Sequence, residues 1–503
     1  MLDIPWDMLS SMPCLLSLLI LPLALLSSTI AQAASSTKPA TRPGIRLFGA
    51  SSYRRLLSAA GFRPSSRVLG GAWVQAVLMY LQGHATPHRD AIYDGVDAVE
   101  DSREGGTVHL HRREPAEGVD CKGDVLILTG ACGSSRDGQI YSAVTLLSRL
   151  GFRSHVMSPR GVDHPIDSHH RCWASTGDIE AAMQAIVSRT PDNESPIYFI
   201  GFSMGGSNVA RWLGEMGKRA GQGESAVWRR VKGGVSVSNP IDVGRCVRHI
   251  DGAPRASLSK LASRGLTWAY KKCYFSQPRP LYRRQRESSV SLALIPSPLL
   301  IALTTSTASL SSSTSTASSS ASPPPPPSPL TAGLSPLPDL SLPLLSSWGE
   351  DEKRLPSVSE DLVERGMRAR TVWECDTLLS CHRFGYERVE DYYRDASCEA
   401  HLEHIQVPFL CLMSLDDPVV PASLVWEMAR RLKDHPTVVF AVTPTGGHNL
   451  FCESWWPVPE KNFAARVIAE WLAGLHETKS RKHSHRYDHE TDDLRSPASL
   501  VGA

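Results

Sequence analysis

Three side chains that could together form a serine nucleophile with its base and acid stand in order along the chain: Ser203, Asp417 and His448. The serine lies in GFSMG (201–205), between an apolar run and a helical pattern. A serine between glycines at a strand-to-helix junction is typical of a nucleophile elbow, whose tight turn exposes the hydroxyl above the sheet. Because a serine hydroxyl is a poor nucleophile without a base, we expect a histidine and an acid at the same sheet edge.

His448 is the best candidate for the base among eighteen histidines. It follows the apolar run TVVFAVT in the sequence PTGGHNLF, where Gly446 and Gly447 let the loop fold back toward the serine. His435 precedes that run, which places it at the opposite edge of the sheet. The remaining late histidines lie in or beside a polar tail, where solvation is expected: His476, His483, His485 and His489.

Two acids, Asp416 and Asp417, directly follow the apolar run FLCLM, at the edge where the acid is needed. We favour Asp417, because the residue before the PVVP turn is expected to direct its carboxylate at His448. The other aspartate is then a turn or helix-capping residue, a role open to either of them.

An oxyanion hole needs two backbone donors beside the serine. The candidates are the N–H groups of Met204, at the start of the following helix, and Ala131, in the loop LTGACGSS after an early strand. The helix start also directs positive partial charge to this spot. The alternative is that TGACG is an ordinary strand-to-helix turn.

The elements that must position these residues alternate between short apolar runs and amphipathic stretches. Such alternation predicts an α/β fold with a mostly parallel central sheet and helices on both faces. The predicted strands are 125–130, 152–159, 196–201, 233–240, 409–413 and 437–443, and the predicted helices are 138–151, 176–189, 207–217, 422–435 and 461–475.

A Ser/Thr/Pro-rich stretch interrupts this pattern at 286–356, and its composition predicts disorder. Because the pattern resumes afterwards, we interpret it as an insertion into one domain, with 45–285 as the first part and 357–475 as the second. An intron translated in error is the other origin, and a transcript across Leu281 to Leu355 distinguishes the two. Residues 476–503 are predicted to be a polar disordered tail.

The N-terminal segment 1–44 is hydrophobic, with no charged residue from Met8 to Ala34. Its length suits a membrane span, while AQAAS resembles a signal-peptidase site after Ala33. Cleaved signal, retained anchor and buried helix all remain open.

Composition excludes several classes of function. The net charge is +2, from 53 basic and 51 acidic residues, which implies no polyanionic partner such as nucleic acid. Eleven cysteines are scattered singly, with no CxxC pair, so neither a zinc site nor a disulfide framework is indicated. We expect no metal or organic cofactor.

With these residues in view, the chain resembles the α/β-hydrolase domain-containing family. The branch holds YheT-like bacterial hydrolases, yeast medium-chain alcohol acyltransferase/esterases, and animal membrane-bound phospholipase and acylglycerol lipase members. The resemblance extends from Leu69 to Leu475 outside the insertion, through GGAWVQAVL, REGGTVHLHR, the elbow region, FGYERVEDYYRDAS and GGHNLF. It implies an α/β-hydrolase fold with a cap, in which Ser203 is nucleophile, Asp417 the orienting acid and His448 the general base.

This chain departs from the family pattern at several places, among them SPRG (158–161), where members carry an Asn/His-Arg-Gly segment. Thr129 stands where members often carry a histidine, which weakens the anchoring of the oxyanion loop. No H-x-x-x-x-D acyltransferase signature accompanies the elbow. Residues 259–275 and 362–379 are candidates for a cap that lines an acyl pocket or merely packs over the sheet.

The sequence therefore predicts a serine hydrolase that cleaves acyl esters, with a lipid such as an acylglycerol or phospholipid as substrate. Acyl transfer to an alcohol and a non-catalytic binding protein of the same fold are the alternatives. Because family members are often single-pass membrane proteins, the resemblance further implies membrane association through one N-terminal pass, with secretion after signal cleavage as the alternative.

Overall fold

The computed structural model describes residues 45–57, 92–101, 106–165, 172–189, 195–220, 226–255, 257–275, 360–454 and 458–493. The strands within these ranges are β1 (Arg46–Phe48), β2 (Gly95–Glu100), β3 (Thr107–Arg113), β4 (Gly123–Leu128), β5 (Phe152–Met157), β6 (Ile197–Phe202), β7 (Val231–Val237), β8 (Phe409–Ser414) and β9 (Val438–Thr443).

These described strands form one sheet in the order β1-β9-β8-β7-β6-β4-β5-β3-β2. The six strands from β5 to β9 in that order run parallel, and β1, β2 and β3 pair antiparallel at the two ends. Strands β4, β6, β8 and β9 are buried along their whole length. Both faces of a parallel sheet are covered, which is why these strands read as continuous apolar runs.

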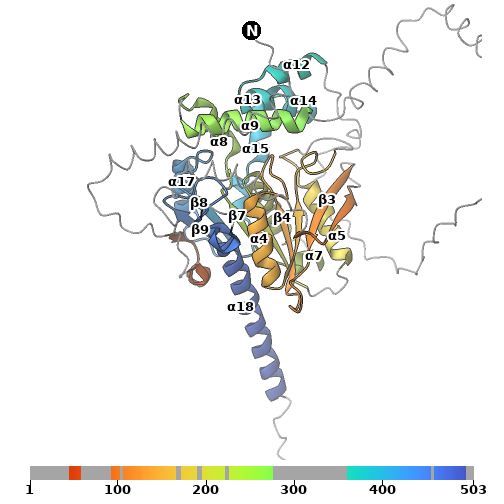
Figure 1. The fold of residues 1–503 in the computed structure, drawn as a ribbon. Helices are drawn as coiled ribbons and strands as arrows, with labels where there is room; N and C mark the ends of the chain where they lie inside the picture. Colours follow the sequence, from red (N-terminus) through yellow and green to blue (C-terminus); the bar gives the residue numbers. More distant parts are fainter. Residues whose placement is uncertain are drawn as a thin grey trace, which may run out of the picture. The chain divides into compact units, whose positions relative to one another are not determined.

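Helices cover both faces of the sheet, which confirms the predicted fold class (Figure 1). One face packs against α4 and α18, whose apolar side chains share a core with Val125, Ile127 and Ile200. On the other face Trp212 of α6 lies against Phe199, with ring centroids 4.9 Å apart. The described helices outside the cap are α2 (Ser51–Arg54), η1 (Arg55–Leu57), α4 (Gly138–Arg149), α5 (Gly177–Arg189), α6 (Met204–Arg219), α7 (Ala226–Arg230), α16 (Glu399–Leu402), α17 (Ala422–Arg431), η6 (Pro459–Lys461) and α18 (Phe463–Asp493).

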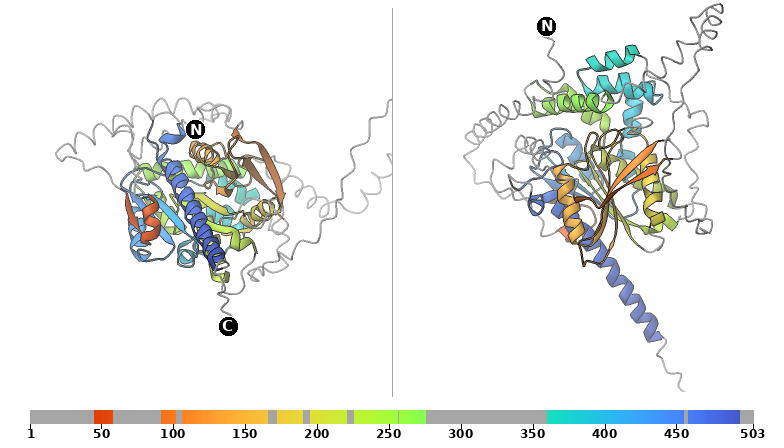
Figure 2. Two further views of the ribbon diagram at one scale, coloured as in Figure 1. Left: turned by 90° about the horizontal axis from the view of Figure 1, so that it is seen from below. Right: turned by 45° about the vertical axis from the view of Figure 1, so that its right-hand side comes forward.

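A second group of helices forms a cap, and these helices lie together beyond one edge of the sheet (Figures 1 and 2). These helices are α8 (Val243–Gly252), α9 (Leu258–Phe275), α12 (Glu360–Arg368), α13 (Val372–Cys375), the π-helical turn η5 (Asp376–Ser380), α14 (Cys381–Arg383) and α15 (Val389–Ala396). The Asp251 carboxylate accepts hydrogen bonds from the Ser263 hydroxyl at 2.5 Å and from the N–H of Trp373 at 2.9 Å. One partly buried carboxylate thus joins the cap segments that come before and after residues 276–359.

The halves of the chain on either side of the predicted insertion form one sheet, because β7 pairs directly with β8. The insertion itself, 286–356, lies outside the described residues. The structure differs from the prediction at the C-terminus, where α18 continues past Leu475 to Asp493. No glycine or proline occurs between Leu475 and Asp493, so no strong helix breaker ends the helix at the predicted boundary.

The prediction of a membrane-associated protein with a single N-terminal pass requires correction. Across the ranges given above, the structure contains no helix with both the length and the apolar character needed to cross a bilayer. Segment 1–44, on which the prediction depended, lies outside those ranges.

The crossing of β6 and α6 leaves no room for a side chain at the two glycines of GFSMG. A Cβ atom added at Gly205 would lie 2.4 Å from the carbonyl oxygen of Thr129 and 2.5 Å from that of Leu128. One at Gly201 would lie 2.4 Å from the carbonyl oxygen of Gly205. These obstacles are backbone atoms at the end of the buried strand β4 and in the first turn of α6, and they cannot move aside. The glycines of GFSMG are therefore required by packing.

We predict that Gly205→Ala lowers the free energy of unfolding by about 1 to 3 kcal/mol, because the added methyl overpacks the crossing. Gly265→Ala is the matched control, since nothing lies within 4 Å of a Cβ at that position in α9. It should leave stability unchanged or raise it by up to about 1 kcal/mol through helix propensity. Urea unfolding of both variants measures this, and equal effects would contradict the packing explanation.

Candidate active site

Ser203 occupies the turn between β6 and α6, with φ 53° and ψ −124°. A positive φ is strained for a residue with a side chain, and it persists only where the surroundings enforce it. Here the Ser203 N–H donates to the carbonyl of Val237 at 2.8 Å, which ties the turn to the end of β7. The hydroxyl is thereby presented at the carboxyl edge of the parallel strands.

His448 lies within hydrogen-bonding distance of both other predicted residues. Its Nε2 is 2.9 Å from the Ser203 hydroxyl oxygen, and its Nδ1 is 2.8 Å from Oδ2 and 3.0 Å from Oδ1 of Asp417. Because a carboxylate can only accept, Nδ1 carries the proton and Nε2 is left to accept from the serine. The structure brings the three side chains together in a geometry that can relay a proton.

The Asp417 carboxylate is held in place by backbone donors. Its Oδ1 accepts the N–H groups of Val419 at 2.8 Å and Val420 at 3.1 Å, in the turn that follows β8. The side chain is 1 % exposed, against 14 % for His448. A buried, hydrogen-bonded carboxylate keeps its orientation, and so fixes that of the imidazole.

Asp416 makes different contacts and is not hydrogen-bonded to His448 through its side chain. It accepts the N–H of Gly447 at 2.9 Å and the Ser414 hydroxyl at 2.6 Å. Burial raises the pKa of Asp416 above its usual value, although both of these hydrogen bonds act in the opposite direction. The structure thus distinguishes the two acids, and Asp416 holds the histidine loop instead of capping a helix.

The histidine loop has an unusually strained backbone. Gly446 and Gly447 have φ values of 149° and 65°, and Asn449 and Phe451 have φ values of 68° and 47°. Glycine adopts this region freely, whereas the other two residues do so at a cost. The N–H of Asn449 donates to the hydroxyl of Ser238 at 2.9 Å, which sequence analysis did not anticipate.

The two predicted oxyanion donors lie on either side of Ser203. Met204 begins α6, and the 130–131 turn approaches so closely that a Cβ on Gly130 would be 3.2 Å from that of Ser203. Among the described residues, neither the Ala131 nor the Met204 N–H donates to another protein group. Neither amide is therefore occupied by a protein acceptor, as the predicted role requires.

Thr129 anchors the oxyanion loop in place of the family's histidine. Its hydroxyl donates to the carbonyl of Gly133 at 2.7 Å, and its N–H donates to the carbonyl of Met157 at 3.2 Å. The threonine side chain thus supplies one hydrogen bond within this loop, and the second bond comes from its backbone.

Asp163 is a residue of this site that sequence reasoning missed. Its carboxylate accepts the hydroxyls of Ser134 at 2.5 Å and Ser158 at 2.6 Å, and the N–H of Ser135 at 2.8 Å. Burial alone would raise the pKa of Asp163, but these hydrogen bonds outweigh burial and hold that pKa below its usual value. No motif signals it, because its partners lie in other loops.

The cap packs directly onto the residue that follows the serine. The Met204 side chain belongs to an apolar cluster with Val243 and Val247 of α8. Further members come from the cap and from the loop before α5: Cys172, Ala174, Cys381, Phe384, Val389, Tyr392, Tyr393 and Ala396, with Ala131, Trp173, Val372, Trp373 and Tyr386 partly buried against them. Of the two cap segments predicted from the sequence, 362–379 contributes Val372 and Trp373 to this cluster, whereas 259–275 contributes no member.

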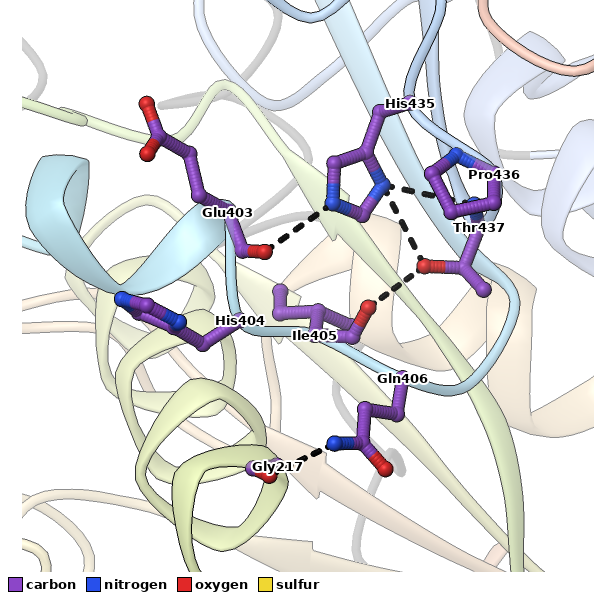
Figure 3. Close-up of a pocket in the computed structure, with 8 residues that line it drawn as sticks. All are labelled: Gly217, Glu403, His404, Ile405, Gln406, His435, Pro436 and Thr437. Atoms are coloured by element: carbon purple, nitrogen blue, oxygen red, sulfur yellow. Dashed lines mark hydrogen bonds between the residues drawn. The ribbon is translucent and has the colours of Figure 1, made fainter.

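A separate depression of about 320 Å³ lies at the opposite edge of the sheet (Figure 3). It is lined by residues that precede β8 and β9, a strand length from Ser203. Its polar groups bond each other: His435 Nε2 donates to the carbonyl of Glu403 at 3.1 Å, and Gln406 donates to that of Gly217 at 2.7 Å. His435 is therefore on the edge that the sequence predicted, away from the serine.

In the part of the chain that the structure describes, no group of three or more His, Cys, Asp or Glu residues is arranged to hold a metal ion. The expectation that catalysis needs no cofactor stays a prediction.

A family model described as the alpha/beta hydrolase fold matches residues 124–454. The chain belongs to this family. Among curated relatives, the phospholipase ABHD3 of Bos taurus is 23 % identical over 70 % of this chain and 63 % of its own length. The monoacylglycerol lipase of Saccharomyces cerevisiae is 23 % identical over 65 % of this chain and 55 % of its own. The chain thus spans less than two thirds of either relative.

Among solved structures, the esterase Pf2001 of Pyrococcus furiosus is 13 % identical, with a TM-score of 0.38 over 72 % of this chain and 86 % of its own. A likeness at that level adds nothing to the family match.

We predict that Asp163→Asn lowers the free energy of unfolding at pH 7 by about 2 kcal/mol, the scale of hydrogen bonds to one charged group. Because the pKa of Asp163 is lowered on folding, its stabilisation is present above the ordinary value of 3.8 and is lost as the pH falls through the folded pKa. The two proteins should therefore converge in stability at acid pH. Denaturant unfolding at pH 7 and at stepwise lower pH measures this.

Asp434→Asn is the control, since that side chain is 88 % exposed. A destabilisation by Asp163→Asn that is equally large at every pH would contradict the ionic role.

Proposed function

We propose that this protein is a serine hydrolase that cleaves acyl esters of lipids through a covalent acyl-enzyme. Ser203 is the nucleophile, His448 the general base and Asp417 the acid that orients it. The N–H groups of Ala131 and Met204 form the oxyanion hole.

One observation carries the proposal. Ser203 Oγ lies 2.9 Å from His448 Nε2, and Nδ1 of the same ring lies 2.8 Å from Asp417, on a serine in a strained strand-to-helix turn. A merely structural serine needs neither the strain nor a base oriented by a buried acid.

The geometry supports a two-step reaction. His448 Nε2 takes the hydroxyl proton as Ser203 Oγ bonds to the acyl carbon, and it then delivers that proton to the leaving alcohol as the ester C–O bond breaks. Water next gives a proton to Nε2 and attacks the acyl carbon, which releases the fatty acid and returns the proton to Ser203. Asp417 stays ionised throughout and stabilises the imidazolium through Nδ1–H.

Two observations support a lipid as the acyl donor. The relatives reported above are named a phospholipase and a monoacylglycerol lipase. The apolar cluster of the cap, with partly buried aromatic side chains such as Trp173 and Trp373, adjoins Met204. Apolar surface of this kind suits an acyl chain.

We predict that Ser203→Ala and His448→Gln each lower kcat for ester hydrolysis by about 10⁴-fold or more, because each removes a member of one proton-transfer unit. His435→Gln is the matched control and should leave kcat unchanged, since His435 faces the opposite edge of the sheet. Hydrolysis of acylglycerol and phospholipid panels, read by mass spectrometry, measures this. The assay is run with and without glycerol, which reveals any capture of the acyl group by an alcohol.

Undiminished hydrolysis by folded Ser203→Ala would refute the proposed function. Activity that requires Ser203 but is confined to short water-soluble esters would refute the lipid assignment alone.

We predict opposite outcomes for the two neighbouring acids. Asp417→Asn should lower kcat by about 10³- to 10⁴-fold, because the amide favours the wrong imidazole tautomer. Asp416→Asn should stay within about tenfold of wild type, since the amide oxygen can still accept the Gly447 N–H. Steady-state kinetics on both variants decides this, and the reverse pattern would assign the acid to Asp416.

A further inference from the structure

Ser238 is a buried serine at the end of β7 that no motif singled out. It is fully buried, has φ 51°, and accepts the N–H of Asn449 at 2.9 Å through its hydroxyl. The residue before it, Val237, accepts the N–H of Ser203 at 2.8 Å. Two consecutive residues therefore hold the backbone of the nucleophile and the backbone next to His448.

The histidine is thus fixed from three sides. Asp417 bonds its ring, Asp416 bonds the N–H of the residue before it, and Ser238 bonds the N–H of the residue after it. The last two bonds set where the His448 backbone lies, which the ring contact to Asp417 does not do alone.

The strain at this contact argues against simple stabilisation. Both Ser238 and Asn449 have positive φ, at 51° and 68°, and neither is glycine. The cost of two such residues is at least as large as the net gain from one neutral hydrogen bond. Strain of this kind is retained where a geometry is needed, and the geometry held here is the 2.9 Å contact between His448 and Ser203.

We propose that Ser238 is a positioning residue, whose hydroxyl acts through the Asn449 backbone to hold His448 within proton-transfer distance of Ser203. The proposal rests on the proposed function of Ser203 and His448. The β7 end is itself fixed, because the Ser238 N–H donates to the carbonyl of Leu412 in β8 at 2.9 Å. Ser238 thus connects the histidine loop to the rigid sheet.

The expected signature is a loss in kcat without a matching change in KM. Ser238 is fully buried, so its removal should not alter substrate binding. Without its acceptor the loop is free to shift, and a shift of about 1 Å at a reacting group can cost about 100-fold in rate. We expect Ser238→Ala to lower kcat by about 10- to 100-fold, and to lower the rate of Ser203 labelling by a fluorophosphonate by a similar factor.

Two further variants separate this role from packing and strain. Ser238→Gly relieves the positive φ but also lacks the acceptor, so its kcat should be no higher than that of the alanine variant. Ser154→Ala is the matched control on β5, since that serine is fully buried and its hydroxyl has no hydrogen-bond partner among the described residues. It should keep wild-type kcat and labelling rate.

The kinetics are measured on protein shown to be folded, alongside Ser203→Ala. A kcat for Ser238→Ala within twofold of wild type, a raised KM at unchanged kcat, or full activity in Ser238→Gly would each overturn the positioning role. Hydrolysis that survives Ser203→Ala would instead refute the proposed function. Should the variants fail to fold, amide hydrogen exchange in the wild type tests whether the Asn449 N–H is held by Ser238. That amide is expected to exchange at least about 100-fold more slowly than an exposed amide. Exchange at the exposed rate would overturn the proposal.

Discussion

The Ser203–His448 contact joins residues 245 positions apart, and it depends on the parallel sheet. The carboxyl ends of β6, β8 and β9 meet at one edge because those strands run in the same direction. Each end then needs only a short loop to reach the others. The cap, the oxyanion loop and the histidine loop are all arranged around that edge, so a change in strand order would separate them.

Strain is concentrated where the loops leave this edge. Ser203, Ser238, Asn449 and Phe451 are the non-glycine residues with positive φ in the described part of the chain. Each lies at the carboxyl end of a strand or in the loop that follows one. The buried strands beside them supply the packing that enforces these conformations, and a less rigid sheet would let them relax.

Carboxylates that are partly or largely shielded from solvent hold the loops and the cap around this edge. Asp163 holds the loop at Ser135, Asp416 holds the histidine loop, and Asp251 joins the two segments of the cap. Each accepts backbone and side-chain donors and so satisfies groups that burial would otherwise leave unpaired. The candidate site therefore consists of the three side chains proposed to react and a larger number of residues that hold them in place.

The sequence by itself determined the α/β fold, the strand-to-helix turn at Ser203 and the ordering of acid and histidine after it. Those features are local, since apolar periodicity, GFSMG and PTGGH each lie within one stretch of chain. It left Asp416 and Asp417 unresolved and gave no sign of Asp163 or Ser238. Only the tertiary structure distinguished the two aspartates and identified Asp163 and Ser238. A hydrogen bond between separate strand ends, such as that from Asn449 to Ser238, produces no recognisable residue spacing in the sequence.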